Sequence, residues 1–156
     1  MTLNLEHDVF FLPRVTRNLG SNTSGINYGV LCVTPSMLYY LPKQIVSMKR
    51  LGILTDSYSV TQLKTADVDG RPLEDVVPLL AGSLDDMEEL DHALEELAAA
   101  TDGSWVLPTR AIERIDIGYF AQLTLFADNQ KHRFAIGGKK HRQRAQEFFS
   151  RQLGLN

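Results

Sequence analysis

Residues 137 to 140 read Gly-Gly-Lys-Lys, and a glycine followed by lysine is the part of a phosphate-binding loop that holds nucleotide phosphates. The complete motif needs a glycine five positions before the Gly-Lys pair and a serine or threonine after it. This sequence has Arg133 and Lys140 at those places. Such a loop also follows a parallel strand in a βαβ unit, whereas the surrounding pattern here indicates a hairpin. We therefore predict that the two glycines join a strand to a helix and bind no nucleotide.

Other patterns that could support chemistry are also incomplete. Residues 67–70, Asp-Val-Asp-Gly, lack the ligand spacing of a calcium loop, and residues 20–25, Gly-Ser-Asn-Thr-Ser-Gly, lack the glycine spacing of a nucleophile elbow. Cys32 lies in an apolar run, which favours a buried core residue over a reactive thiol. The histidines are dispersed, without metal-ligand spacing: His7, His92, His132 and His141. We predict no catalytic, cofactor-binding or metal-binding residue, and a protein that is not an enzyme.

The charged residues are distributed unevenly. From Asp67 to Asp102 there are twelve acidic residues and one basic residue, so this region carries a net charge of -11 while the rest of the chain carries +8. Six basic residues fall within fourteen positions that contain no carboxylate: Lys131, Arg133, Lys139, Lys140, Arg142 and Arg144. Such a cluster could contact an anion or a partner, or could be solvated charge with no ligand.

The composition is that of a globular chain. A length of 156 residues is typical of one domain, and 44% hydrophobic with 22% charged residues is ordinary usage, so we expect residues 1–156 to form a single domain. No run of residues approaches the roughly 20 apolar positions of a transmembrane helix, and the first residues lack the pattern of a signal peptide. With a single cysteine, these features predict a cytoplasmic protein.

Strand patterns occupy the two ends of the chain. Before residue 43 there are three runs rich in β-branched and aromatic residues, and Thr34-Pro35-Ser36 marks a tight turn between the second and third. After residue 103 there are four more, and Asp128-Asn129-Gln130 predicts a hairpin turn before the last. The seven predicted strands are 7–17, 26–34, 37–41, 104–108, 111–120, 122–127 and 131–137. In the last, Phe134 and Ile136 are expected to face inward.

Residues 43–103 have a helical and acidic character. Residues 43–54 show helical spacing, Pro72 suits a first helical position, and Pro78 is expected to end or kink that helix. A second helix is predicted over 83–100, with Ser83 as its N-cap. Its apolar stripe is Met87, Leu90, Leu94, Leu97 and Ala98, which we expect to pack on the sheet, although a seven-residue spacing leaves pairing with another helix open.

A final amphipathic helix is predicted to begin near Lys139 or Lys140. Its apolar arc contains His141, Ala145, Phe148, Phe149, Gln152 and Leu153, and the two phenylalanines are the expected anchors. Trp105, at the start of a strand, is expected to pack in the core rather than to line a ligand groove.

The order of these elements resembles the pleckstrin-homology (PH)-like superfold, including bacterial PH-like and GRAM-type domains. The resemblance rests on GVLCVTPSMLYYLP, VLPTRAIERIDI, LTLFADNQKHRFAI and RAQEFFSRQL, and covers most of residues 8–42 and 104–153. It implies an α+β fold: a bent, nearly closed, antiparallel seven-stranded barrel capped by the C-terminal helix. The acidic region, about 43–103, would be a helical insertion between the third and fourth strands.

Members of this superfold usually bind lipid head groups, peptides or proteins, so the resemblance implies a non-enzymatic binding or scaffold module. We expect a protein partner, or a second copy of the chain. Peripheral binding to an anionic membrane, through the basic hairpin and helix start, is the alternative. The loop before the second strand has only Arg14 and Arg17, which disfavours specific inositol-phosphate recognition. No basic groove lined with aromatic residues indicates nucleic acid.

Overall fold

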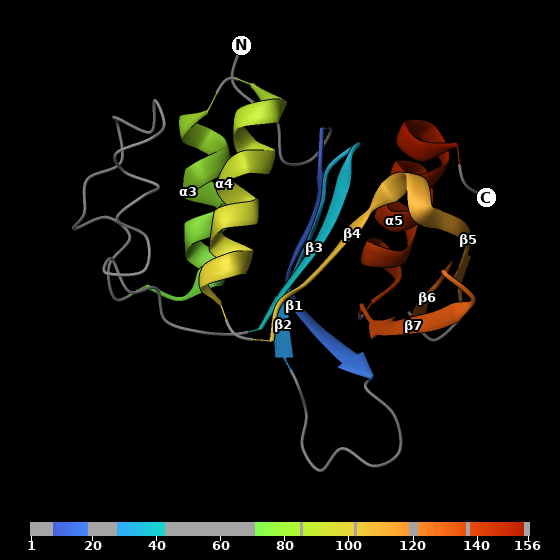
Figure 1. Ribbon diagram of the computed structural model, residues 1–156. Coiled ribbons are helices and arrows are strands. Elements are labelled where there is room, and N and C mark those ends of the chain that lie inside the picture. The colour runs from blue at the N-terminus through green and yellow to red at the C-terminus, as the bar shows by residue number, and fades with distance from the viewer. Residues whose placement is uncertain are drawn as a thin grey trace.

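The computed structural model describes residues 8–18, 28–42, 71–84, 86–101, 103–118, 122–136 and 138–154 (Figure 1). The strands are β1 (Phe10–Asn18), β2 (Tyr28–Val33), β3 (Met37–Pro42), β4 (Trp105–Pro108), β5 (Ile112–Ile117), β6 (Gln122–Ala127) and β7 (Gln130–Ala135). The helices are α3 (Leu73–Ser83), α4 (Met87–Ala100), α5 (Lys139–Leu153) and a short 3-10 turn at Thr109–Ala111.

All seven strands form one antiparallel sheet in the order β4-β3-β2-β1-β7-β6-β5. β1 joins the two halves of the sheet, because its first part pairs with β2 and its last residues pair with β7. Its register shifts between Leu12 and Val15, beside Pro13, which has no N–H to donate to a neighbouring strand. β4 and β5 are the two edges, so the described sheet is open. The predicted α+β class and seven antiparallel strands are confirmed.

Both faces of β2 and β3 are buried, which explains why these strands are apolar at almost every position. On one face, Cys32, Tyr39 and Leu41 pack against the apolar sides of α3 and α4. On the other, Leu31, Leu38 and Tyr40 belong to the cluster that contains α5. In Figure 1 the α3–α4 pair therefore lies on one side of β3, while α5 lies on the other with β5, β6 and β7.

The predicted apolar stripe of α4 is the buried one. Leu90, Leu94 and Leu97 are almost completely buried against the sheet and α3. The helix begins later than expected, however. Ser83 is the last residue of α3, and Asp86 is the N-cap of α4, where its carboxylate accepts a hydrogen bond from the Glu88 amide at 3.0 Å. Aspartate caps as well as serine does, and the sequence offers both.

Pro78 neither ends α3 nor confines it to one turn, because the helix continues to Ser83. A proline at this position removes one main-chain hydrogen bond near the start of the helix. Val76, Val77 and Leu80 are buried on either side of it, so packing on the sheet holds the helix together. Pro72 is the N-cap residue, one position before the predicted place.

Several local predictions are confirmed by the backbone. The Thr34 hydroxyl accepts a hydrogen bond from the Met37 amide at 3.0 Å, closing the turn between β2 and β3. Asp128 and Asn129 have φ angles of 52° and 61°, as a tight hairpin turn requires. Gly138 has φ 58°, where glycine is favoured, and lies directly before α5. The predictions for residues 19–27 and 43–54, and for Tyr119, lie outside the described residues.

Phe148 and Phe149 anchor α5 as expected. Their rings lie 6.0 and 5.8 Å from the ring of Phe10, between centroids, so the helix is held against β1. Trp105 packs in the same cluster, with its ring 4.3 Å from that of His132 and 5.9 Å from that of Phe134. These contacts join β4 to β7 across the inside of the bent sheet.

Candidate functional site

The six basic residues singled out by the sequence do not form one surface. Lys131 and Arg133 are exposed on β7 and alternate with buried Phe134, so they project from the face opposite to the one that α5 covers. The other four are on the first turns of α5. There, Lys139 and Lys140 are exposed, whereas Arg142 and Arg144 are half-buried. Two separate basic surfaces result, each with fewer charges than the sequence cluster suggested.

The first turn of α5 contains no acidic residue, and no side chain caps it. The amide groups at a helix start carry partial positive charge, so Lys139 and Lys140 add to an already positive helix end. This end of the molecule can attract anions, although its charge is confined to a short segment.

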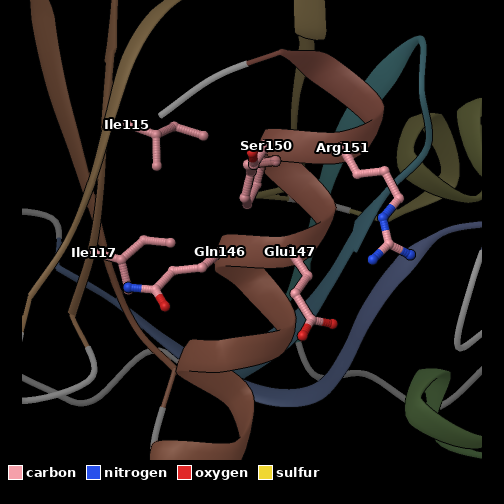
Figure 2. A pocket seen from close by; sticks show the side chains of 7 residues that line it. Ile115, Ile117, Gln146, Glu147, Ser150 and Arg151 are labelled. Carbon is pink, nitrogen blue, oxygen red and sulfur yellow. The ribbon is translucent and has the colours of Figure 1, made fainter.

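A pocket of about 460 Å³ lies between β5 and α5. Ile115 and Ile117 line it from the strand, and Figure 2 shows their side chains pointing towards the helix. The residues that line it from α5 are Gln146, Glu147, Phe149, Ser150 and Arg151. In Figure 2, Gln146 extends towards Ile117, while Glu147 and Arg151 lie further round the helix. The pocket thus has an apolar strand side and a polar helix side.

β5 also has main-chain groups without a partner in the described part of the chain. The Gly118 amide donates to the Gln122 carbonyl at 2.8 Å, which places Gly118 and Gln122 in a hydrogen-bonded pair. Because pairing alternates along antiparallel strands, the amide and carbonyl groups of Ile115 and Ile117 point away from β6. They lie at the open edge of the sheet, on the strand that lines the pocket.

Sequence reasoning identified only part of this pocket. The strand over 111–120 and Phe149, in the apolar arc of α5, were expected, but the polar residues that line the pocket from α5 were not assigned to a site. The missing information was the strand order, which makes β5 an edge, and the placement of α5 beside it. No local pattern in the sequence reports that order.

A third group of polar residues lies under α4. The Asp91 carboxylate accepts hydrogen bonds from the Thr34 hydroxyl at 2.7 Å and from the Tyr39 hydroxyl at 2.8 Å. Burial, and the hydrogen bond to Asp91, raise the pKa of Tyr39. Burial first, and the charge of Asp91 second, raise the pKa of Cys32 to about 12. A thiol with that pKa is protonated at neutral pH and is not a nucleophile. The hydrogen bonds from Thr34 and Tyr39 to Asp91 therefore serve to hold α4 on the sheet.

The side chains among the described residues indicate what kind of ligand the pocket can take. No group of three or more His, Cys, Asp or Glu side chains suitable for a metal ion occurs among them. The residues that line the pocket include a serine but neither histidine nor cysteine. No described helix is both long and apolar enough to cross a membrane. The pocket presents isoleucines, an amide, a hydroxyl and charged groups, which together can bind a polypeptide.

Comparison with protein-family models, with curated proteins and with solved structures finds no match to this chain.

Proposed function

We propose that this chain is a non-enzymatic, PH-like protein-binding module that takes an extended segment of a partner protein into the groove between β5 and α5. The observation that carries the proposal is that β5, an edge strand of the described sheet, lies beside the pocket. The strand order, followed by a helix after β7, agrees with the PH-like arrangement that the sequence resembles. Fold alone does not confer binding, so the proposal rests on the groove itself.

The expected mode of binding is strand addition. A peptide laid along β5 would exchange main-chain hydrogen bonds with Ile115 and Ile117, and alternate peptide side chains would enter the pocket. Six residues of strand offer about 20 Å of edge, which is enough for a segment of similar length. The isoleucines favour an apolar side chain in the pocket. Glu147 and Arg151 can pair with charges of either sign at its rim.

The test uses peptides selected on the full chain from a phage-displayed random library, measured by fluorescence anisotropy. Gln146→Trp places a bulky side chain in the pocket, and it should weaken binding by at least about tenfold. Gln143→Trp is the matched control, because Gln143 is an exposed glutamine of the same helix that does not line the pocket. Its affinity should match that of the wild type. Equal weakening by both variants, or a selection that yields no peptide, contradicts the proposal.

Binding to an anionic membrane is the second candidate, and the positive first turn of α5 favours it. Each basic residue near an anionic surface contributes about 1 kcal/mol, so Lys139 and Lys140 supply a weak attraction. The chain should sediment with vesicles containing phosphatidylserine more than with neutral vesicles, and Lys139→Glu with Lys140→Glu should abolish the difference. Equal sedimentation with the two kinds of vesicle contradicts this candidate.

A further inference from the structure

A second surface lies on the outer face of β5, β6 and β7, opposite to the groove. The strand registers place Arg114, Phe126 and Lys131 in one row across this face. Arg114 has its guanidinium carbon 4.0 Å from the centre of the Phe126 ring, and Lys131 has its ammonium nitrogen 5.6 Å from the same point. The next row contains Arg133. We call Arg114, Phe126, Lys131 and Arg133 the basic sheet face.

This face combines positive charge with a partly exposed aromatic ring. Phe126 is half-buried, and the three basic side chains are exposed. Asp116 lies on the same side of the sheet and is 3.4 Å from Arg114, so it offsets part of the charge. The buried side chains of these strands, Leu123, Leu125 and Phe134, point the other way into the cluster with α5. A half-exposed phenylalanine among cations suits an acidic partner with an apolar component.

The same chain carries a surface of that chemistry on α3 and α4. These two helices contain seven carboxylates and no lysine or arginine. Glu88, His92, Glu95 and Ala99 are exposed at spacings of four, three and four residues, so they form one stripe on the outside of α4. Neither Glu88 nor Glu95 forms an ion pair with another described residue. We call this stripe the acidic helix face.

The two faces cannot meet within one molecule. The α3–α4 pair lies on one side of β3, and β5, β6 and β7 lie at the other end of the molecule (Figure 1). The opposite, apolar stripe of α4 is buried against the sheet of the same molecule. Leu90 and Leu94 therefore cannot pair with a helix of another copy, and the acidic helix face points outward. A second copy of the chain, arranged head to tail, offers each face a face of opposite charge.

We propose that the acidic helix face of one copy docks on the basic sheet face of a second copy, giving head-to-tail self-association. This surface is distinct from the groove between β5 and α5, so either proposal can fail without the other. Electrostatic complementarity between exposed faces makes the association dependent on ionic strength.

The test is light scattering after gel filtration, at about 20 mM and about 500 mM salt, over a range of protein concentrations. The wild type should have a mass above that of one chain at low salt and should approach a single chain at high salt. A sheet-face variant, Lys131→Glu with Arg133→Glu, and a helix-face variant, Glu88→Lys with Glu95→Lys, should each be monomeric. Mixed in equal amounts, they should associate again, because each supplies the face that the other has lost.

A control for the sheet-face variant has the same change in net charge, but outside both faces. Arg14→Glu with Arg110→Glu alters two exposed residues, one in β1 and one in the 3-10 turn, and should associate as the wild type does. Circular dichroism confirms that each variant is folded. A wild type that is monomeric under every condition overturns the proposal, as does a mixture that stays monomeric. A third outcome also overturns the proposal: the chain stays monomeric and instead binds an added single-stranded oligonucleotide, and loses that binding when Phe126 is replaced by alanine.

Discussion

The hydroxyl of Tyr39 on β3 donates a hydrogen bond to the carboxylate of Asp91 on α4, over 2.8 Å, and so attaches the acidic helices to the sheet. The same carboxylate accepts from the hydroxyl of Thr34, at the turn that precedes β3. One hydroxyl from β3 and one from the turn before it thus both donate to a single carboxylate of α4, within an otherwise apolar contact.

Removing the Tyr39 hydroxyl tests this attachment. Tyr39→Phe keeps the ring and should lower the free energy of unfolding by about 1.5–3 kcal/mol, the usual contribution of a hydrogen bond to a charged group. The measurement is urea denaturation followed by tryptophan fluorescence. In an Asp91→Ala background the same substitution should have a smaller effect, because the carboxylate acceptor is gone and only the main-chain carbonyl of residue 91, 3.1 Å from the hydroxyl, remains. Equal effects in the two backgrounds would show that the hydroxyl stabilises the fold in another way.

Cys32 and Tyr39 predict how stability depends on alkaline pH. The pKa of Cys32 is raised to about 12 in the folded chain from 9.0, so between these values the unfolded chain releases a proton that the folded chain retains. The free energy of unfolding should therefore be unaffected by these groups below about pH 9 and should fall above it, by up to about 1.4 kcal/mol per pH unit for each group. The raised pKa of Tyr39 acts in the same direction.

Urea denaturation at about pH 8 and about pH 10.5 measures this loss of stability. Cys32→Ala should reduce the loss, because one of the two groups no longer titrates. A stability that rises with pH over this range, or a Cys32→Ala variant with an unchanged loss, contradicts the account.

Replacing Gly29 or Gly82 by alanine should change the stability of the fold in opposite directions. A Cβ atom at Gly29 would lie 2.6 Å from Cε2 of Tyr40 and 2.7 Å from the Leu41 carbonyl oxygen, so Gly29→Ala should destabilise the chain by about 1–3 kcal/mol. At Gly82, inside α3, a Cβ atom meets nothing within 4 Å, and Gly82→Ala should stabilise the chain by about 0.5–1 kcal/mol. Thermal unfolding of both variants checks the signs, and a stabilising Gly29→Ala would contradict the described packing.

Local features of the fold could be predicted from the sequence where a short segment determines them. The hairpin at Asp128 and Asn129, the start of α5 and the buried stripe of α4 each depend on nearby residues. The N-cap of α4 was placed wrongly because Ser83 and Asp86 are both good caps, and the local sequence does not distinguish them. Pro78 does not end α3, because its local effect is outweighed by buried neighbours.

The surfaces could not be predicted in the same way, because strands distant in the sequence create them. Arg114, Phe126 and Lys131 meet only through the registers of three strands, and no local pattern groups them. The cluster of six basic residues was contiguous in the chain but is divided between a sheet face and a helix end. The groove depends on β5 being an edge, which is a property of the whole sheet.

Hydrogen exchange of single amides in β5 tests the central claim, that a partner segment adds to this edge, most directly. In the free chain, the amides of Ile115 and Ile117 should exchange faster than that of Asp116, which faces β6. Saturation with a peptide selected on the chain should slow the exchange of Ile115 and Ile117 by at least about tenfold, because strand addition gives both amides an acceptor. If the bound peptide leaves both rates unchanged, binding occurs elsewhere and the proposed groove is wrong.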